Sequence, residues 1–200
     1  MNKLIVICGG DRLGKGSLIK GLCEYYDYKN ITIRHCGKPP KGINYLEQAA
    51  FQEKAFKEEF NLIHNIFSTS KKYSYHDNVI IYDRFYLGEY VYATLFRNAN
   101  PQVIKEKLLF FEQFNFTSVD FKIYLVTLTA DPDFFLSKED GQSFSQNLEQ
   151  KTKELQLFKE AHEFSHITNK KIIKVDENGK FRSKEEILKE VLELIEPKDV

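Results

Sequence analysis

The 200-residue sequence has no tryptophan, one methionine, few cysteines and no excess of either charge. Lysine plus arginine and aspartate plus glutamate both number 29, so the chain lacks the basic excess that holds nucleic acid or an anionic membrane. No apolar run approaches the roughly 20 residues that span a bilayer. Met1-Asn2-Lys3 leads into an apolar run and then glycines, unlike a signal peptide. We therefore expect a cytoplasmic protein that binds neither nucleic acid nor membrane.

Cysteine and arginine are both scarce. The three cysteines, Cys8, Cys23 and Cys36, lack the paired spacing of a zinc site, so we expect buried thiols in a reducing compartment. Arginine is rare compared with lysine. We therefore expect the few arginines at positions where a planar, two-pronged donor is needed. The arginines are Arg12, Arg34, Arg84, Arg97 and Arg182.

Apolar, β-branched runs alternate with segments of helical periodicity along the whole chain. We expect strands at 4–8, 31–35, 79–82, 122–128 and 171–175, and helices at 17–26, around 45–73, and at 103–114, 145–165 and 183–195. Strands that are apolar throughout are typical of a parallel sheet buried on both faces. The pattern predicts an α/β fold: a five-stranded parallel sheet flanked by helices on both faces, in one domain spanning 1–200.

A glycine-rich turn joins the first strand to the first helix. It matches the P-loop pattern Gly-x-x-x-x-Gly-Lys, in which backbone N–H groups surround a phosphate and the lysine adds a positive charge. This predicts a nucleoside triphosphate site with Mg²⁺. The expected ATP-binding residues are Gly10, Asp11, Arg12, Leu13, Gly14, Lys15, Gly16 and Ser17.

The third strand ends in an acidic residue followed by an arginine. Asp83 is placed to hold Mg²⁺ or its waters, and Arg84 to clamp a second phosphate, although a surface ion pair would explain both. A GTPase is disfavoured because the sequence Asn169-Lys170-Lys171-Ile172 lacks the aspartate that reads guanine.

The P-loop Gly-x-Asp-Arg-x-Gly-Lys, the strand-end Asp83-Arg84-Phe85 and the block 62–71 together resemble the thymidylate kinases. The run 83–92 is similar to phage-encoded members, so the host cytoplasm is a possible location. The resemblance implies the P-loop NTPase fold, transfer of the γ-phosphoryl group of ATP to dTMP or a related nucleotide such as dUMP, and a homodimer. It implies catalytic roles for Arg12, Lys15 and Arg84.

On the acceptor side the resemblance implies four contacts. Asp11 would contact the deoxyribose 3′-hydroxyl, and Arg84 would bind the monophosphate. Phe67 would stack on the base, with a core position as its alternative. Tyr92 would lie beneath the sugar and disfavour a 2′-hydroxyl.

Two further acceptor contacts stay open. Either Arg34 or Lys38 would grip the acceptor phosphate. Lys71, or its neighbour Lys72, stands where the family has a base-reading arginine and lacks the planar fork of that residue.

The metal site and the lid depart from the family pattern. Gly16 replaces the usual serine, so Ser17 is the candidate hydroxyl beside Asp83 for the metal. A short lid is expected around 137–150, and it contains no arginine. This fits the family arrangement in which the catalytic arginine, here Arg12, lies in the P-loop.

Two rival functions share the fold. A deoxynucleoside kinase needs a general-base carboxylate near the end of the second strand, and 31–41 contains no Asp or Glu. A non-catalytic nucleotide-binding module is the other, against which the P-loop lysine and the Asp83-Arg84 pair argue. The aromatic run 110–116 is expected in the core or at an interface, and His162 and His166 on a solvated helix face.

Overall fold

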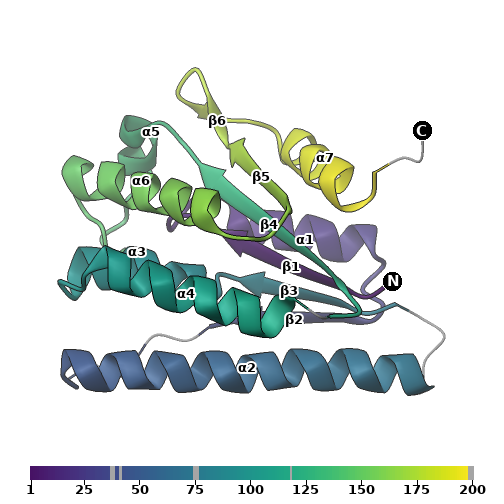
Figure 1. Cartoon of the computed structure of the whole chain (residues 1–200). Helices are drawn as coiled ribbons and strands as arrows, with labels where there is room; N and C mark the ends of the chain where they lie inside the picture. Colours follow the sequence, from purple (N-terminus) through teal and green to yellow (C-terminus); the bar gives the residue numbers. More distant parts are fainter. Residues whose placement is uncertain (37–38, 41, 74–76, 118, 198–200) are drawn as a thin grey trace.

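The computed structural model describes residues 1–36, 39–40, 42–73, 77–117 and 119–197, the side chains of 70–73 excepted. Five parallel strands form the central sheet in the order β2-β3-β1-β4-β5 (Figure 1). The strands are β1 Lys3–Cys8, β2 Ile31–His35, β3 Val79–Asp83, β4 Lys122–Thr129 and β5 Asn169–Lys174. The predicted α/β fold and its five strands are confirmed.

Helices cover both faces of the sheet (Figure 1). Helices α1 (Lys15–Tyr25) and α7 (Lys184–Ile195) pack on one face. The other face is covered by α2 (Tyr45–Tyr73), α3 (Leu87–Phe96), α4 (Pro101–Phe116) and α6 (Leu148–Phe164). Among the described residues, no helix combines the length and the apolarity that crossing a membrane requires.

Strand β1 shows why the sheet needs two covers. Its alternate residues point to opposite faces: Leu4 and Val6 belong to the core beneath α2, α3, α4 and α6, whereas Ile5 and Ile7 belong to the core beneath α1 and α7. All four are completely buried. A continuous apolar strand is stable only when both of its faces are covered.

Four short elements, two helices and two strands, were not predicted. Helix α3 begins at Leu87, three residues after Arg84, and α5 (Pro132–Ser137) includes Phe135, which is fully buried. Strands β6 (Asp176–Glu177) and β7 (Lys180–Phe181) form a small hairpin after β5. Between α5 and α6 lies a loop, 138–147, which we call the α5–α6 loop.

The structure corrects the expectation for His162 and divides the aromatic run 110–116 between the core and the surface. His162 is buried, and its Nδ1 lies 2.9 Å from Thr127 Oγ1 on β4, so the solvated helix face is wrong for this residue. In the aromatic run, Phe111 packs against the core, whereas Phe110 and Phe114 are 69% and 79% exposed. The helix turns its second set of aromatic rings away from the core.

Candidate active site

The P-loop forms an anion site at the start of α1. Gly14 precedes the helix with φ 85°, a left-handed conformation that glycine adopts without strain. No side chain caps the helix and no acidic residue lies in its first turn, so the first N–H groups are available to a phosphate. Lys15 Nζ donates to the carbonyl oxygens of Gly9 at 3.1 Å and Gly10 at 2.7 Å. Burial, and next the charge of Arg84, lower the pKa of Lys15 to about 8.

A buried aromatic ring supports the P-loop from below. Gly10 packs so closely on Phe135 that a Cβ at this position would overlap the ring. Lys151 Nζ lies 4.0 Å from the centre of the same ring, and the Lys151 side chain is completely buried. Glycine at position 10 therefore serves close packing.

Asp83 brings a carboxylate to the P-loop. Strand β3 pairs with β1 so that Asp83 lies opposite Ile7, and it lines one cleft of about 710 Å³ with Lys15 and Ser17. Among the described residues, Asp83 Oδ1 is buried without a hydrogen-bond partner, and Oδ2 lies 3.8 Å from His35 Nδ1. Magnesium prefers such hard oxygen donors and completes its shell with water and phosphate, so the residues fit this ion.

Arg84 is held in one orientation beside the P-loop. The backbone φ of Arg84 is 61°, which is unusual for a residue with a side chain. Its backbone N–H donates to the carbonyl oxygen of Ile7 at 2.9 Å. Its Nη2 donates to Asp11 Oδ1 at 2.5 Å, and its guanidinium lies 5.4 Å from the ring centre of Tyr92. Burial opposes the positive charge, but Tyr92 and Asp11 outweigh it and raise the pKa of Arg84. Arg84 is a permanently charged, oriented donor.

A second cleft, of about 400 Å³, lies on the other side of Arg84; we call it the acceptor pocket. It is lined by residues of α2 and α3, of the end of β2 and of the α5–α6 loop, including Gln52, Phe56, Arg84, Glu89, Tyr92 and Arg97. Arg84 borders this pocket, and its partner Asp11 borders the P-loop cleft. The two clefts therefore adjoin at the Asp11–Arg84 pair.

Tyr92 is fixed by a buried carboxylate. Its hydroxyl donates to Glu154 Oε1 on α6 at 3.0 Å, and Glu154 is only 2% exposed. Burial raises the pKa of Glu154. The ring of Tyr92 is thereby held against Arg84 at the edge of the acceptor pocket.

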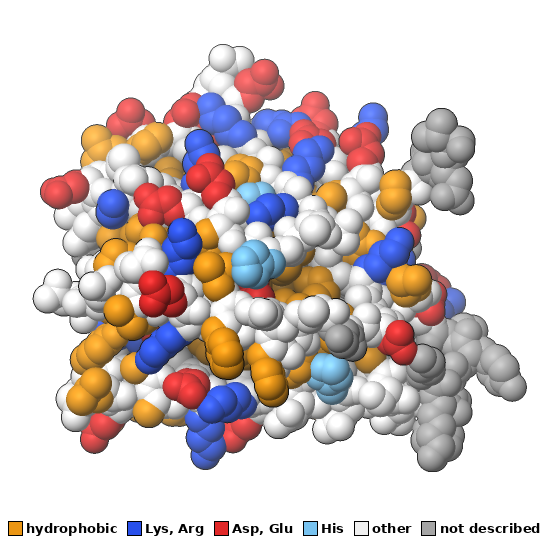
Figure 2. Space-filling model, viewed as in Figure 1, with side chains coloured by type: hydrophobic (Ala, Val, Ile, Leu, Met, Phe, Trp, Pro, Cys, Tyr) orange, Lys and Arg blue, Asp and Glu red, His pale blue; other side chains and the backbone are white. Residues whose placement is uncertain are grey.

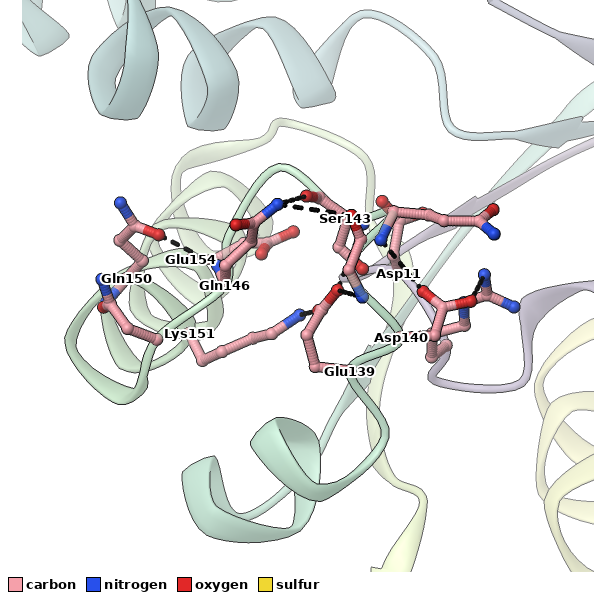
Figure 3. Close-up of polar contacts among 12 residues, drawn as sticks. Asp11, Glu139, Asp140, Ser143, Gln146, Gln150, Lys151 and Glu154 are labelled. Atoms are coloured by element: carbon pink, nitrogen blue, oxygen red, sulfur yellow. Dashed lines mark hydrogen bonds and ion pairs between the residues drawn. The ribbon is translucent and has the colours of Figure 1, made fainter.

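The α5–α6 loop lies over the P-loop cleft and is tied down at two points (Figure 3). Glu139 pairs with Lys151 at 2.5 Å and accepts the N–H groups of Gly141 and Ser143. Although burial acts in the opposite direction, the bonds from Lys151 and Ser143 lower the pKa of Glu139 to about 2. Asp140 forms an ion pair with Arg12 of the P-loop.

Two predicted acceptor contacts do not lie in the acceptor pocket. Phe67 is 5% exposed and packs 4.5 Å from the ring of Phe121, just before β4, at the amino ends of the strands. Its carbonyl accepts from Asn2, just before β1. The structure therefore places Phe67 in the core, the alternative position, and apart from the described lining of the acceptor pocket.

Arg34 is also occupied elsewhere. Its guanidinium makes two bonds to Glu59 on α2, one of them at 2.9 Å from Nε to Oε2, and it does not line the pocket. Arg34 is therefore held by Glu59 and not at the described lining of the acceptor pocket. Lys38 lies outside the described residues, and so does the side chain of Lys71.

The residues that line the acceptor pocket and that sequence reasoning missed include Gln52, Phe56, Glu89 and Arg97. Gln52 and Phe56 are one helical turn apart on α2, a spacing that places them on one face. The scarcity of arginine was the available signal for Arg97.

Comparison with solved structures shows that this chain shares its fold with two thymidylate kinases and a polyphosphate kinase 2. No family model and no curated protein matches it. The thymidylate kinase from Candida albicans superposes with a TM-score of 0.58 at 15% identity, covering 98% of this chain and 91% of that one. Polyphosphate Kinase 2 from Arthrobacter aurescens TC1 gives 0.60 at 14% identity, covering 98% and 68%. Thymidylate kinase from Ehrlichia chaffeensis gives 0.51 at 12%, covering 98% and 100%.

Proposed function

We propose that the protein is a cytoplasmic nucleoside monophosphate kinase that transfers the γ-phosphoryl group of ATP to dTMP or a related pyrimidine deoxynucleotide such as dUMP. One observation carries the proposal. The P-loop cleft and the acceptor pocket meet at the Asp11–Arg84 pair, so a donor and an acceptor phosphate would face each other there. Transfer between two bound nucleotides needs such adjoining sites.

The donor phosphates would lie at the start of α1, against the free N–H groups and Lys15. Asp83 and the hydroxyl of Ser17 would hold Mg²⁺, which when bound neutralises phosphate charge. Phe181, whose ring is 46% exposed at the same cleft, offers a flat surface to the adenine. That ring favours a nucleotide donor over polyphosphate.

The acceptor would bind with its phosphate on Arg84 and its sugar on Tyr92. A phosphate monoester is itself the nucleophile. The reaction therefore needs the two phosphates to be positioned and their negative charge to be neutralised, but it needs no general base. Arg12 would cover the transferring phosphoryl group once ATP displaces its present partner, Asp140. The α5–α6 loop would then act as the lid of a single kinase domain.

The absence of a carboxylate at the end of β2 separates this proposal from a deoxynucleoside kinase. His35 and Cys36 line the pocket there, and neither is a carboxylate that could serve as the general base for a 5′-hydroxyl. We expect thymidine to be a poor substrate and dTMP a good one.

The test is a panel of the common nucleoside and deoxynucleoside monophosphates, with thymidine included, against ATP and polyphosphate as donors. ADP formation with dTMP or dUMP supports the proposal. Transfer only to thymidine, transfer only from polyphosphate, or no transfer to any acceptor would each reject it, and single-turnover transfer from labelled ATP separates an enzyme from a binding module. From the family resemblance we also propose a homodimer.

A further inference from the structure

The acceptor pocket contains two arginines at opposite ends of one helix. Arg84 lies just before α3 and Arg97 directly follows its last residue, and both line the pocket. The ten residues of α3 rise about 15 Å. If the acceptor phosphate lies on Arg84, the base of the nucleotide points along α3 toward Arg97.

Arg97 is paired within the pocket but not fully satisfied. Its Nη2 lies 2.5 Å from Glu89 Oε2, and both side chains are 10% exposed. Among the described residues, Arg97 Nη1 is buried without a hydrogen-bond partner. A buried donor without an acceptor costs free energy, so such a group in a native protein usually binds an ordered water or a ligand.

The neighbouring side chains form a place for a flat ring. Phe56 and Phe96 line the same pocket, and Gln52 lies one turn of α2 from Phe56. Glu89 supplies an acceptor oxygen beside the donor groups of Arg97. A donor and an acceptor side by side match the edge of a nucleic acid base, which presents the complementary pair.

We infer that Arg97 and Glu89 determine base specificity, and that they favour a base with a carbonyl oxygen at its outer edge. This inference rests on the proposed function, because it requires a nucleoside monophosphate in the pocket. Arg97 donates to the carbonyl oxygen, and Glu89 accepts from the adjacent ring N–H. Thymine and uracil present this pattern and so does guanine, whereas the amino group of cytosine or adenine sets a donor against Arg97.

The experiment compares the parent with Arg97→Lys and with the double variant Arg97→Met/Glu89→Leu. Lysine keeps a charge for Glu89 but loses the guanidinium fork, and the double variant leaves no buried charge unpaired. The first readout is kcat/KM for dTMP, dUMP, dCMP, dGMP and dAMP. The second is the rise in Tm caused by each nucleotide without ATP, which reports binding independently of catalysis.

We expect the parent to favour dTMP and dUMP over dCMP, and dGMP over dAMP, by at least about tenfold. Both variants should reduce these ratios to within about threefold, while KM for ATP stays at the parental value. Arg182→Lys is the matched control. Arg182 also pairs with a glutamate at 2.5 Å, Glu190, but it lines neither cleft, so its variant should keep the parental ratios.

Three results would overturn the inference. A parent that prefers dCMP or dAMP would mean that the base lies shifted, with its amino group on Glu89. Parental ratios in both variants, with only Tm lowered, would make the pair purely structural and leave the kinase proposal standing. If no monophosphate reacts or raises Tm, the proposed function fails, and this inference fails with it.

Discussion

Arg84 Nη2 lies 2.5 Å from Asp11 Oδ1, and this contact joins the strand-end motif to the P-loop. The two residues are 73 positions apart in the sequence. They meet because β3 and β1 are neighbours in parallel register, with Asp83 opposite Ile7, so both loops leave the same edge of the sheet. Arg84 therefore has both roles that the sequence left open, an ion pair and a position in the candidate site.

Arg84→Lys should raise KM for dTMP by roughly tenfold, about 1.4 kcal/mol, because lysine cannot bind the phosphate with two prongs. KM for ATP should stay close to the parental value. Steady-state kinetics with each substrate varied in turn provide the measurement. A lower Tm with an unchanged KM for dTMP would show that Arg84 acts only through Asp11.

Arg12→Ala and Lys15→Ala should each lower kcat by about 10²-fold or more, since charge stabilisation is the main resource of phosphoryl transfer. Asp140→Asn is the matched comparison, because it removes only the carboxylate that holds Arg12. This partly exposed pair contributes about 1 kcal/mol or less, so kcat should change by less than about fivefold. Full kcat in Arg12→Ala would reject the P-loop arginine arrangement.

Phe56→Leu and Phe67→Leu form a pair that locates the base. Both rings are almost fully buried on α2, but only Phe56 lines the acceptor pocket. Phe56→Leu should raise KM for dTMP by about fivefold through lost ring contact. Phe67→Leu should lower the free energy of unfolding by about 1–2 kcal/mol and leave KM unchanged. The reverse pattern of KM values would return Phe67 to the site.

His162 should make the folded protein less stable in mild acid. Burial, with the charge of Lys170 adding to it, lowers the pKa of His162 from 6.5 to about 4. Between these values the unfolded chain binds more protons than the folded one, so stability is complete above pH 6.5 and falls as the pH falls toward 4. At about 1.4 kcal/mol per pKa unit, the loss should be about 3 kcal/mol. Urea unfolding of the parent and of His162→Gln between pH 4 and 6.5 measures this loss. If the free energy of unfolding depended on pH equally in the two proteins, the prediction would be contradicted.

The exposed aromatic rings of α4 offer a surface for the proposed homodimer. Hydrophobic side chains gather over α4 and α2 in Figure 2, and a groove of about 780 Å³ between these helices is lined by Phe110 and Phe114. Sedimentation at micromolar concentration should find a dimer, and Phe110→Glu with Phe114→Glu should convert it to a monomer. A parent that sediments as a clean monomer would reject the dimer.

The sequence alone determined the parts of this protein that depend on local pattern. The glycines before Lys15 predict a phosphate loop because they let the backbone N–H groups turn around a phosphate, and Gly14 has the left-handed conformation that such a turn needs. Continuous apolar runs predict the parallel sheet. Asp83 and Arg84 follow such a run directly, so the sheet edge at which they lie was also predictable.

The tertiary structure decided which residues form the acceptor pocket. Helix α2 has 29 residues and rises about 43 Å, so its sequence pattern marks a buried face but not which part of that face reaches the carboxyl edge of the sheet. Packing sets this position: it brings Phe56 to the pocket and leaves Phe67 against Phe121, about 16 Å farther along the helix. In the same way the pairing of Arg34 with Glu59 and of Arg97 with Glu89 follows from side chains that meet only in the folded chain.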